Sequence, residues 1–339
     1  MPRRLAIVMA VLFLSAGAAL AGPRPPRRTL VVQDLGAFDG DNTLGVALNE
    51  VGQIVGIAVS ASNLTSSFLW ESGSMSDIGP GRPVDINNRG QILLQAAVGN
   101  PDDPSPCFLL QGSTLTDLEV PTGWQCHAAD LNDAGQVTGS LSSSGGLSTT
   151  RGFLWSAGTF TDLGTLGGDI VIPVAMNERG QVVGGAMTPS GYEHAFLWDA
   201  GVMTDLGVPG GLSSRATAIN DRGQVLVQSG PRVYLFEAGV MTDLGTMGAQ
   251  GPDQFPIPLD LNDRGQMLIA VADAQAHTYR YSLWTARRPV PLPSLGGGEP
   301  GAVRLNDLGQ VTGTDRTGEG SAWHLALWTT VVTRGHRPR

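Results

Sequence analysis

The sequence contains no lysine, so all 21 basic residues among its 339 are arginines. This absence excludes a P-loop and any enzyme that uses lysine as a nucleophile or Schiff base, because those functions need its amine. The basic residues are outnumbered by 30 acidic ones, which gives a formal net charge of −9 at pH 7. That balance repels phosphate backbones, and we expect no nucleic acid among the partners.

Residues for metal binding and for common hydrolase motifs are also scarce. Only two cysteines and five histidines occur, without an H-x-x-x-H or H-E-x-x-H spacing, so no zinc site is predicted. Neither a G-x-S-x-G elbow nor the S-x-D-x-G-x-x-W box of sialidases is present. D-x-N-x-x-G occurs three times, but the place of a further calcium ligand holds Arg89, Ala134 and Arg264. We therefore expect neither a metal nor another cofactor.

Long apolar runs are lacking except near the N-terminus. The 17 residues from Leu5 to Ala21 follow two arginines and fall short of the ~20 that span a bilayer. Ala21 before Gly22 completes an A-x-A cleavage site. We predict a Sec-type signal peptide (1–21), a flexible leader (22–28) and a secreted mature protein, extracellular or periplasmic, with no stable membrane insertion. An uncleaved membrane anchor is the alternative.

Glycine, in contrast, is abundant, with 47 residues or about twice the usual share of ~7%, and part of it recurs in a fixed motif. An N-x-x-G-Q tag occurs seven times, at successive spacings of 38, 45, 45, 43, 42 and 44 residues. Its asparagines are Asn49, Asn87, Asn132, Asn177, Asn220, Asn262 and Asn306. Seven copies in one register indicate a single structural unit repeated in tandem.

Each unit has the pattern of four short strands. β-Branched or aromatic runs lie between glycines, and no 3.6-residue helical period appears. In N-x-x-G, asparagine caps backbone amides and glycine takes the left-handed conformation that closes a hairpin. A second turn, W-x-x-G, follows motifs such as Phe153-Leu154-Trp155, and we predict that it repeats this geometry. We name the strands a to d: a precedes N-x-x-G, b follows it, c ends in tryptophan and d ends in D-L-G.

Seven such units predict an all-β fold, a seven-bladed β-propeller of four-stranded antiparallel blades over 29–333, followed by a disordered tail (334–339). Radial stacking covers both apolar faces of each sheet. A linear β-solenoid is the rival, but the sequence lacks its capping repeats. The segment 30–36 resembles strand d, and we predict that this N-terminal strand closes the last blade and removes its free edge. We expect a monomer.

The repeat resembles the bacterial HAF repeat, a family of extracellular tandem repeats named after a His-Ala-Phe triplet. The fullest copy here contains His194-Ala195-Phe196 and then Met203-Thr204-Asp205-Leu206-Gly207. The resemblance covers residues 30–328, and the literal triplet occurs once. It implies export and tandem repetition, and it brings no shared activity to this chain.

Strand direction assigns the connections to two rims. The a–b and c–d turns share one rim, here called the turn rim, and the b–c and d–a connections share the other, the variable rim. The segments that differ between units all fall on the variable rim, where rigid scaffolds usually carry binding residues. Neutral insertions are the alternative. Five candidate ligand contacts lie in these segments: Trp124, His127, Tyr192, His277 and Trp323.

Other polar positions are interpreted as structural. Cys107 and Cys126 are the candidates for a disulfide, because two cysteines in an exported chain normally pair. A Cys126 nucleophile beside His127 is the alternative. His194 and His324 occupy a position that holds arginine in several other units, which is typical of a repeated polar site. The aspartate of D-L-G recurs in six copies, as turn caps do.

The first functional hypothesis is an exported, non-catalytic binding or surface-interaction protein with an unknown glycan or protein ligand on the variable rim. No acid–base pair stands outside the repeat pattern, which favours this reading. The alternative is a secreted or periplasmic hydrolase or lyase with its site in the central funnel of the propeller. Two carboxylates, or a histidine and a carboxylate, converging in that funnel would favour the enzyme.

Overall fold

The computed structural model describes residues 27–39, 42–62, 64–96, 105–143, 149–208, 210, 213–318 and 321–333. The chain divides into a large compact unit, Leu30–Thr330, and a small unit made of Met1–Thr29 and Val331–Arg339. The predicted signal peptide and C-terminal tail lie outside the described residues, as does the leader up to residue 26. No described helix is long and apolar enough to cross a membrane.

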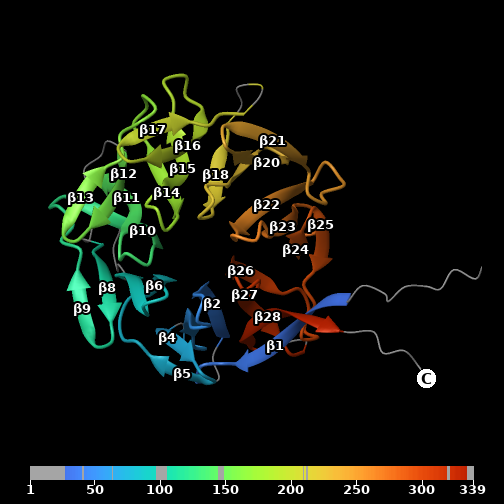
Figure 1. The fold of residues 1–339 in the computed structure, drawn as a ribbon. Helices are drawn as coiled ribbons and strands as arrows, with labels where there is room; N and C mark the ends of the chain where they lie inside the picture. The colour runs from blue at the N-terminus through green and yellow to red at the C-terminus, as the bar shows by residue number, and fades with distance from the viewer. Residues whose placement is uncertain are drawn as a thin grey trace, which may run out of the picture. The chain divides into compact units, whose positions relative to one another are not determined.

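The large unit is a ring of seven antiparallel sheets (Figure 1), each with four strands. Blade I contains β2 (Asn42–Leu48), β3 (Ile54–Val59), β4 (Thr65–Glu71) and β5 (Ser74–Asp77). Blade II contains β6 (Arg82–Ile86), β7 (Gln91–Gln95), β8 (Cys107–Gln111) and β9 (Thr114–Asp117). Blade III contains β10 (Trp124–Leu131), β11 (Val137–Ser143), β12 (Thr150–Ser156) and β13 (Thr159–Asp162).

The next three blades continue the same a–b–c–d order. Blade IV contains β14 (Val171–Met176), β15 (Val182–Met187), β16 (Glu193–Asp199) and β17 (Val202–Asp205). Blade V contains β18 (Arg215–Ile219), β19 (Val225–Ser229), β20 (Arg232–Glu237) and β21 (Val240–Gly245). Blade VI contains β22 (Gln254–Leu261), β23 (Met267–Asp273), β24 (Thr278–Thr285) and β25 (Arg288–Pro291).

The last blade joins the two ends of the ring. Blade VII orders β26 (Gly301–Leu305), β27 (Val311–Arg316), β28 (Trp323–Thr333) and then β1 (Arg27–Gly36). The N-terminal strand therefore supplies strand d of the last blade. The predicted seven-bladed propeller, its four-stranded blades and this closure are confirmed.

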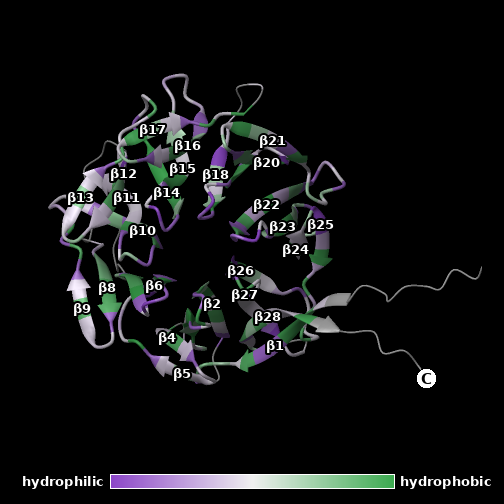
Figure 2. Ribbon diagram, viewed as in Figure 1, coloured by the Kyte–Doolittle hydropathy of each residue, from purple (hydrophilic) through white to green (hydrophobic). Residues whose placement is uncertain are grey.

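The core lies between neighbouring sheets. Leu268 and Leu283 of blade VI, for example, pack in one cluster with Val311 and Trp328 of blade VII. Burial of such a side chain stabilises the fold by about 1.5–3 kcal/mol. Apolar residues follow the strands, and hydrophilic ones gather at the turns around the central channel (Figure 2). Radial stacking thus covers both faces of each blade, as the repeat predicts.

The N-x-x-G turns have the predicted geometry. In blade IV, the side-chain Oδ1 of Asn177 accepts the backbone N–H groups of Arg179 at 3.1 Å and Gln181 at 3.0 Å. Gly180 donates its N–H to the Asn177 carbonyl at 2.9 Å and has a φ of 75°. Glycine is preferred there because a side chain resists positive φ.

The prediction that W-x-x-G repeats this geometry is wrong. The turn between β12 and β13 consists of Ala157 and Gly158, whose φ values are 46° and 85°. Positive φ at both central residues is typical of a two-residue type I′ hairpin, whose twist matches that of the flanking strands. The two turns on the turn rim therefore differ in type.

Candidate functional site

Two rings of hydrogen bonds border the central channel at the turn rim. In the first ring, the Nδ2 of each tag asparagine donates to the backbone carbonyl of its counterpart in the next blade, over 2.9 to 3.5 Å. Asn306 of blade VII closes this ring by donating to the Asn49 carbonyl at 3.1 Å. The asparagine that recurs in every tag therefore links each blade to the next.

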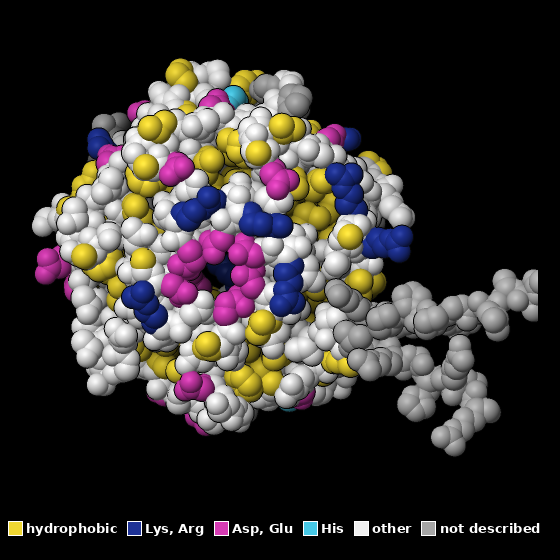
Figure 3. Space-filling view, viewed as in Figure 1, with side chains coloured by type: hydrophobic (Ala, Val, Ile, Leu, Met, Phe, Trp, Pro, Cys, Tyr) yellow, Lys and Arg dark blue, Asp and Glu magenta, His cyan; other side chains and the backbone are white. Residues whose placement is uncertain are grey.

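The second ring is formed by the residue after each tag asparagine. Its backbone N–H donates to the side chain of its counterpart in the next blade over 2.6 to 2.9 Å. The members of this acidic ring are Glu50, Asn88, Asp133, Glu178, Asp221, Asp263 and Asp307. Six carboxylates thus surround the mouth of the channel (Figure 3).

The crowding of carboxylates affects their protonation. Partial burial at the channel mouth raises the pKa of Glu178 to about 7, and the charges of Asp133 and Asp221 add to the rise. Burial likewise raises the pKa of Glu50 and of Asp307. Backbone N–H donors oppose these shifts because they stabilise the charged form.

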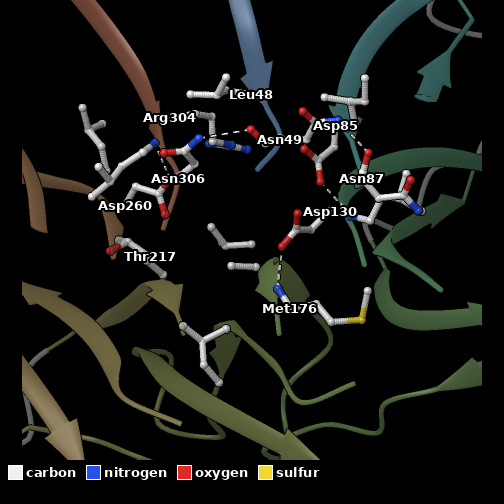
Figure 4. A pocket seen from close by; sticks show the side chains of 18 of the residues that line it. Leu48, Asn49, Asp85, Asn87, Asp130, Met176, Thr217, Asp260, Arg304 and Asn306 are labelled. Carbon is white, nitrogen blue, oxygen red and sulfur yellow. Dashed lines mark hydrogen bonds between the residues drawn. The ribbon is translucent and has the colours of Figure 1, made fainter. Parts of the chain in front are cut away.

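Inside the acidic ring, four charged side chains converge on a cavity of about 540 Å³ (Figure 4). They are Asp85, Asp130, Asp260 and Arg304, each two residues before a tag asparagine on an innermost strand. Every aspartate accepts a backbone N–H from the next blade. The acceptor–donor pairs are Asp85 with Leu131 at 3.0 Å, Asp130 with Met176 at 2.7 Å, and Asp260 with Leu305 at 2.8 Å.

Asp85 and Asp130 lie on neighbouring blades and face the same cavity. Burial, and then the charge of Asp85, raise the pKa of Asp130 well above its ordinary range. Burial also raises the pKa of Asp260, against the opposing charge of Arg304. Asp130 therefore keeps its proton at pH values where exposed aspartates are ionised.

Of the two described arginines that line this cavity, Arg304 is the unpaired cation, because Arg215 bonds to the Glu193 carboxylate at 2.6 Å. Burial opposes the charge of Arg304, but the carboxyl groups of the three aspartates outweigh that effect and raise its pKa. Within the described part of the chain, the guanidinium forms neither a hydrogen bond nor an ion pair. The Thr217 hydroxyl, in the wall of the same cavity, is buried and has no partner among the described residues.

A second cavity, the blade VI pocket, lies against β24 and β25 and has a volume of about 420 Å³. Connections of the variable rim border it, because Tyr279 is the second residue of β24 and Glu299 precedes β26. The rings of Tyr279 and Tyr281 lie 6.3 Å apart, and Trp284 also lines the pocket. Arg280 contributes the positive charge beside these aromatic side chains.

Polar contacts hold the blade VI pocket in shape. Glu299 accepts the backbone N–H of Tyr279 at 2.7 Å, and Arg280 donates to the Gln254 side chain at 3.1 Å. Burial, together with Tyr279 and Glu299 nearby, raises the pKa of Tyr281. The side chain of Tyr279 itself is 47% exposed, so its ring is open to a ligand.

The five candidate contacts from the sequence lie on four different blades. On β10 of blade III, Trp124 faces Arg151 at 5.9 Å, and the His127 ring lies 2.9 Å from the Ser142 hydroxyl. Tyr192, before β16, is 51% exposed. His277 stands before β24, near the blade VI pocket, with a φ of 54°. Trp323 starts β28 and is covered by the Arg316 guanidinium at 4.3 Å.

Cys107 and Cys126 form a disulfide, with Cα atoms 6.0 Å apart. The bond links strand c of blade II to strand a of blade III, and both side chains are fully buried. It therefore staples two neighbouring blades. The bonded Cys126 sulfur has no free thiol for the nucleophilic role that the sequence left open.

The repeated polar position before tryptophan forms a pair with the D-L-G aspartate. His194 lies 2.9 Å from Asp205 across β16 and β17, as Arg151 lies 2.9 Å from Asp162 in blade III. The same aspartates cap the following turn, since Gly207 donates its N–H to Asp205 at 2.8 Å. These contacts agree with the structural interpretation of both positions.

The sequence alone did not identify the blade VI pocket or the four charged side chains that meet in the channel cavity. A signal for the acidic ring was present, since the residue after the tag asparagine is acidic in six of seven copies. The sequence pattern of Asp85, Asp130 and Asp260 suggested only a calcium loop, which their neighbours argued against. Among the described residues, no group of three His, Cys, Asp or Glu side chains is placed to hold a metal ion.

No protein-family model and no curated protein matches the sequence. Among solved structures, the chain is similar to the β-propeller domain of the Trilobed protease from Pyrococcus furiosus, with a TM-score of 0.60, 9% identity, and coverage of 86% of this chain and 95% of that one. It is also similar to the Pyrococcus horikoshii acylaminoacyl peptidase, with a TM-score of 0.55, 12% identity, and coverage of 86% and 52%.

A third similar structure is a puromycin-hydrolyzing peptidase of Mycobacterium tuberculosis, with a TM-score of 0.51 and 12% identity over 84% of this chain and 49% of that one. The chain thus spans about half the length of the last two peptidases. At these identities the similarity shows the propeller fold.

Proposed function

We propose that this protein is an exported, non-catalytic binding module that holds a glycan in the blade VI pocket on the variable rim. The observation that carries this proposal is the pocket itself, where Tyr279, Tyr281 and Trp284 stand beside Arg280 and Glu299. Ligand sites typically combine an apolar, aromatic lining with a few polar groups that set orientation. Aromatic rings suit the apolar faces of sugars, and the two charged side chains can bond to their hydroxyls.

Export is proposed from the N-terminal sequence, with its two arginines, apolar run and A-x-A site. The paired cysteines support it, because disulfides persist in oxidising compartments. Expression of the full chain in a bacterium with a Sec pathway, followed by mass spectrometry of the exported fraction, tests this part. We expect a mature N-terminus at Gly22, and an uncleaved chain in the membrane fraction would contradict export.

A glycan and peptide array probed with the exported protein tests the ligand class. We expect glycan spots to bind, and Tyr279→Ala to weaken that binding about tenfold, since a pocket aromatic typically contributes more than 1 kcal/mol. Tyr192→Ala is the matched control, because that tyrosine is similarly exposed on blade IV. Binding to peptides alone, or loss of binding in Tyr192→Ala, Trp124→Ala or Trp323→Ala but not in Tyr279→Ala, would overturn the proposal.

A hydrolase is the second candidate, and the presence of Asp85 and Asp130 in one cavity favours it. Two neighbouring carboxyl groups, of which Asp130 has a raised pKa, can supply an acid and a base to one reaction. Both groups are also used in blade-to-blade hydrogen bonds, which favours the structural role. Hydrolysis of chromogenic glycosides or peptides that is abolished by Asp130→Asn would support the hydrolase, and absence of turnover across such a panel would reject it.

A further inference from the structure

The central channel holds a cation whose hydrogen-bonding capacity is unused. A guanidinium carries five N–H donors, and within the described residues none of them from Arg304 reaches an acceptor. The other charged side chains of the cavity have partners: Arg215 bonds to the Glu193 carboxylate, and the three aspartates accept backbone N–H groups. Arg304 therefore has room for an acceptor that enters from outside.

The three aspartates can accept further hydrogen bonds, so they need donors, whereas Arg304 needs an acceptor. Each uses carboxylate oxygens for backbone N–H donors, but a carboxyl group has about four acceptor positions. The remaining positions face the same 540 Å³ cavity as Arg304 (Figure 4). A ligand that satisfies the cavity must bring a donor to the aspartates together with an acceptor for Arg304.

Charge at the entrance narrows the ligand class. The six carboxylates of the acidic ring repel a simple anion, so a free carboxylate or phosphate is disfavoured. A simple cation would pass this ring, but it would lie beside Arg304 and leave the guanidinium without an acceptor. A zwitterion avoids both costs, since its positive end faces the aspartates and its carboxylate can bind Arg304 with two hydrogen bonds.

We propose that the central channel binds a small zwitterion of the α-amino acid class, with its carboxylate on Arg304 and its ammonium on Asp85, Asp130 and Asp260. The cavity is large enough for such a molecule, since small-molecule sites commonly occupy about 300–1,000 Å³. This site is separate from the blade VI pocket and would give the propeller a second ligand on its axis.

Isothermal titration of the full chain with three related probes tests the proposal. L-Alanine carries both charges, propionate lacks the ammonium, and ethylammonium lacks the carboxylate. We expect L-alanine to bind, and the other two to bind at least about tenfold more weakly, because each leaves one side of the cavity unpaired. Equal binding of L-alanine and ethylammonium would show a plain cation site, and no binding of L-alanine would show a water-filled channel; either result overturns the proposal.

Two variants locate the site. Arg304→Gln should weaken L-alanine binding about tenfold, because it removes the charged donor that faces the ligand carboxylate. Arg264→Gln is the control, since Arg264 lies on the same rim but bonds to the Leu308 carbonyl. Unchanged affinity in Arg304→Gln would overturn the assignment. If that variant does not fold, the three-probe comparison on the unmodified chain still decides, and Tyr279→Ala, which tests the glycan pocket, should leave L-alanine binding unaltered.

Discussion

The imidazole Nδ1 of His324 lies 3.0 Å from both carboxylate oxygens of Asp34, which stands 290 residues earlier in the chain. This contact joins β28 to β1, the two strands that complete blade VII. Asp34 also caps its own turn, by accepting the Gly36 N–H at 2.8 Å. One aspartate therefore serves both the local turn and the closure of the ring.

Asp34→Ala should lower the free energy of unfolding by about 1 kcal/mol, because it removes a partly exposed contact with His324 and a turn cap. Urea denaturation measures this change. Asp205→Ala is the matched control, since Asp205 makes the same pair with His194 and caps its own turn within blade IV. We expect faster proteolysis at the N-terminal strand in Asp34→Ala alone, and equal protection in both variants would show that the His324 contact does not hold the closing strand.

Gly180→Val should destabilise the protein by about 1 kcal/mol or more, because a β-branched residue resists a φ of 75°. The added Cβ would also lie 3.1 Å from the Gln136 side-chain oxygen in the neighbouring blade. Thermal unfolding measures the loss. Gly251→Val is the control, because its Cβ would meet nothing within 4 Å and its φ lies outside the left-handed region. Similar melting temperatures for both variants would contradict the turn assignment.

The acidic ring should make stability depend on pH. The pKa of Glu178 is raised from 4.5 to about 7, so the folded state holds a proton that the unfolded state has released. The contribution of this proton to the free energy of unfolding is complete below the unfolded pKa of 4.5. It decreases as pH rises and is lost above about 7. Because the partly buried Glu178 still has much of its surface in contact with solvent, screening limits the effect to about 1 kcal/mol.

Glu178→Gln should flatten this dependence, since glutamine keeps the acceptor for the Asp133 N–H but does not ionise. Unfolding free energies of both proteins across this pH range provide the measurement. Glu71→Gln is the control, because Glu71 accepts a side-chain hydrogen bond from Gln53 away from the ring. An identical slope in wild type and Glu178→Gln would show that the ring carboxylates titrate as isolated groups.

Removal of the disulfide should cost about 3 kcal/mol on the chain-entropy estimate for a sequence separation of 19 residues. We expect dithiothreitol to lower the melting temperature of the wild-type protein. The Cys107→Ser/Cys126→Ser double variant should already melt at the lower temperature and should not respond to the reductant. A wild-type protein that is insensitive to dithiothreitol would indicate that the bond is not formed in solution.

The sequence by itself determined the repeat, and with it the number and strand content of the blades. The N-x-x-G tag and the strand-c motif are local signals, because turn chemistry and alternation act over a few residues. The segment 30–36 resembles strand d, and the last unit lacked a strand d of its own. The sequence therefore also indicated that this segment joins the last blade, as it does. The W-x-x-G turn was assigned wrongly because alanine or serine at its first central position does not signal positive φ.

Only the tertiary structure decided what the channel and the pocket contain. Asp85, Asp130, Asp260 and Arg304 are at least 44 residues apart in sequence, and each occupies a position that varies between the repeats. Closing the ring brings these side chains to one axis, where burial and mutual charge raise the pKa values of Asp130, Asp260 and Arg304. The blade VI pocket depends in the same way on how β24 and the connection before β26 pack together. Such convergence depends on the curvature of the whole ring, which no single repeat encodes.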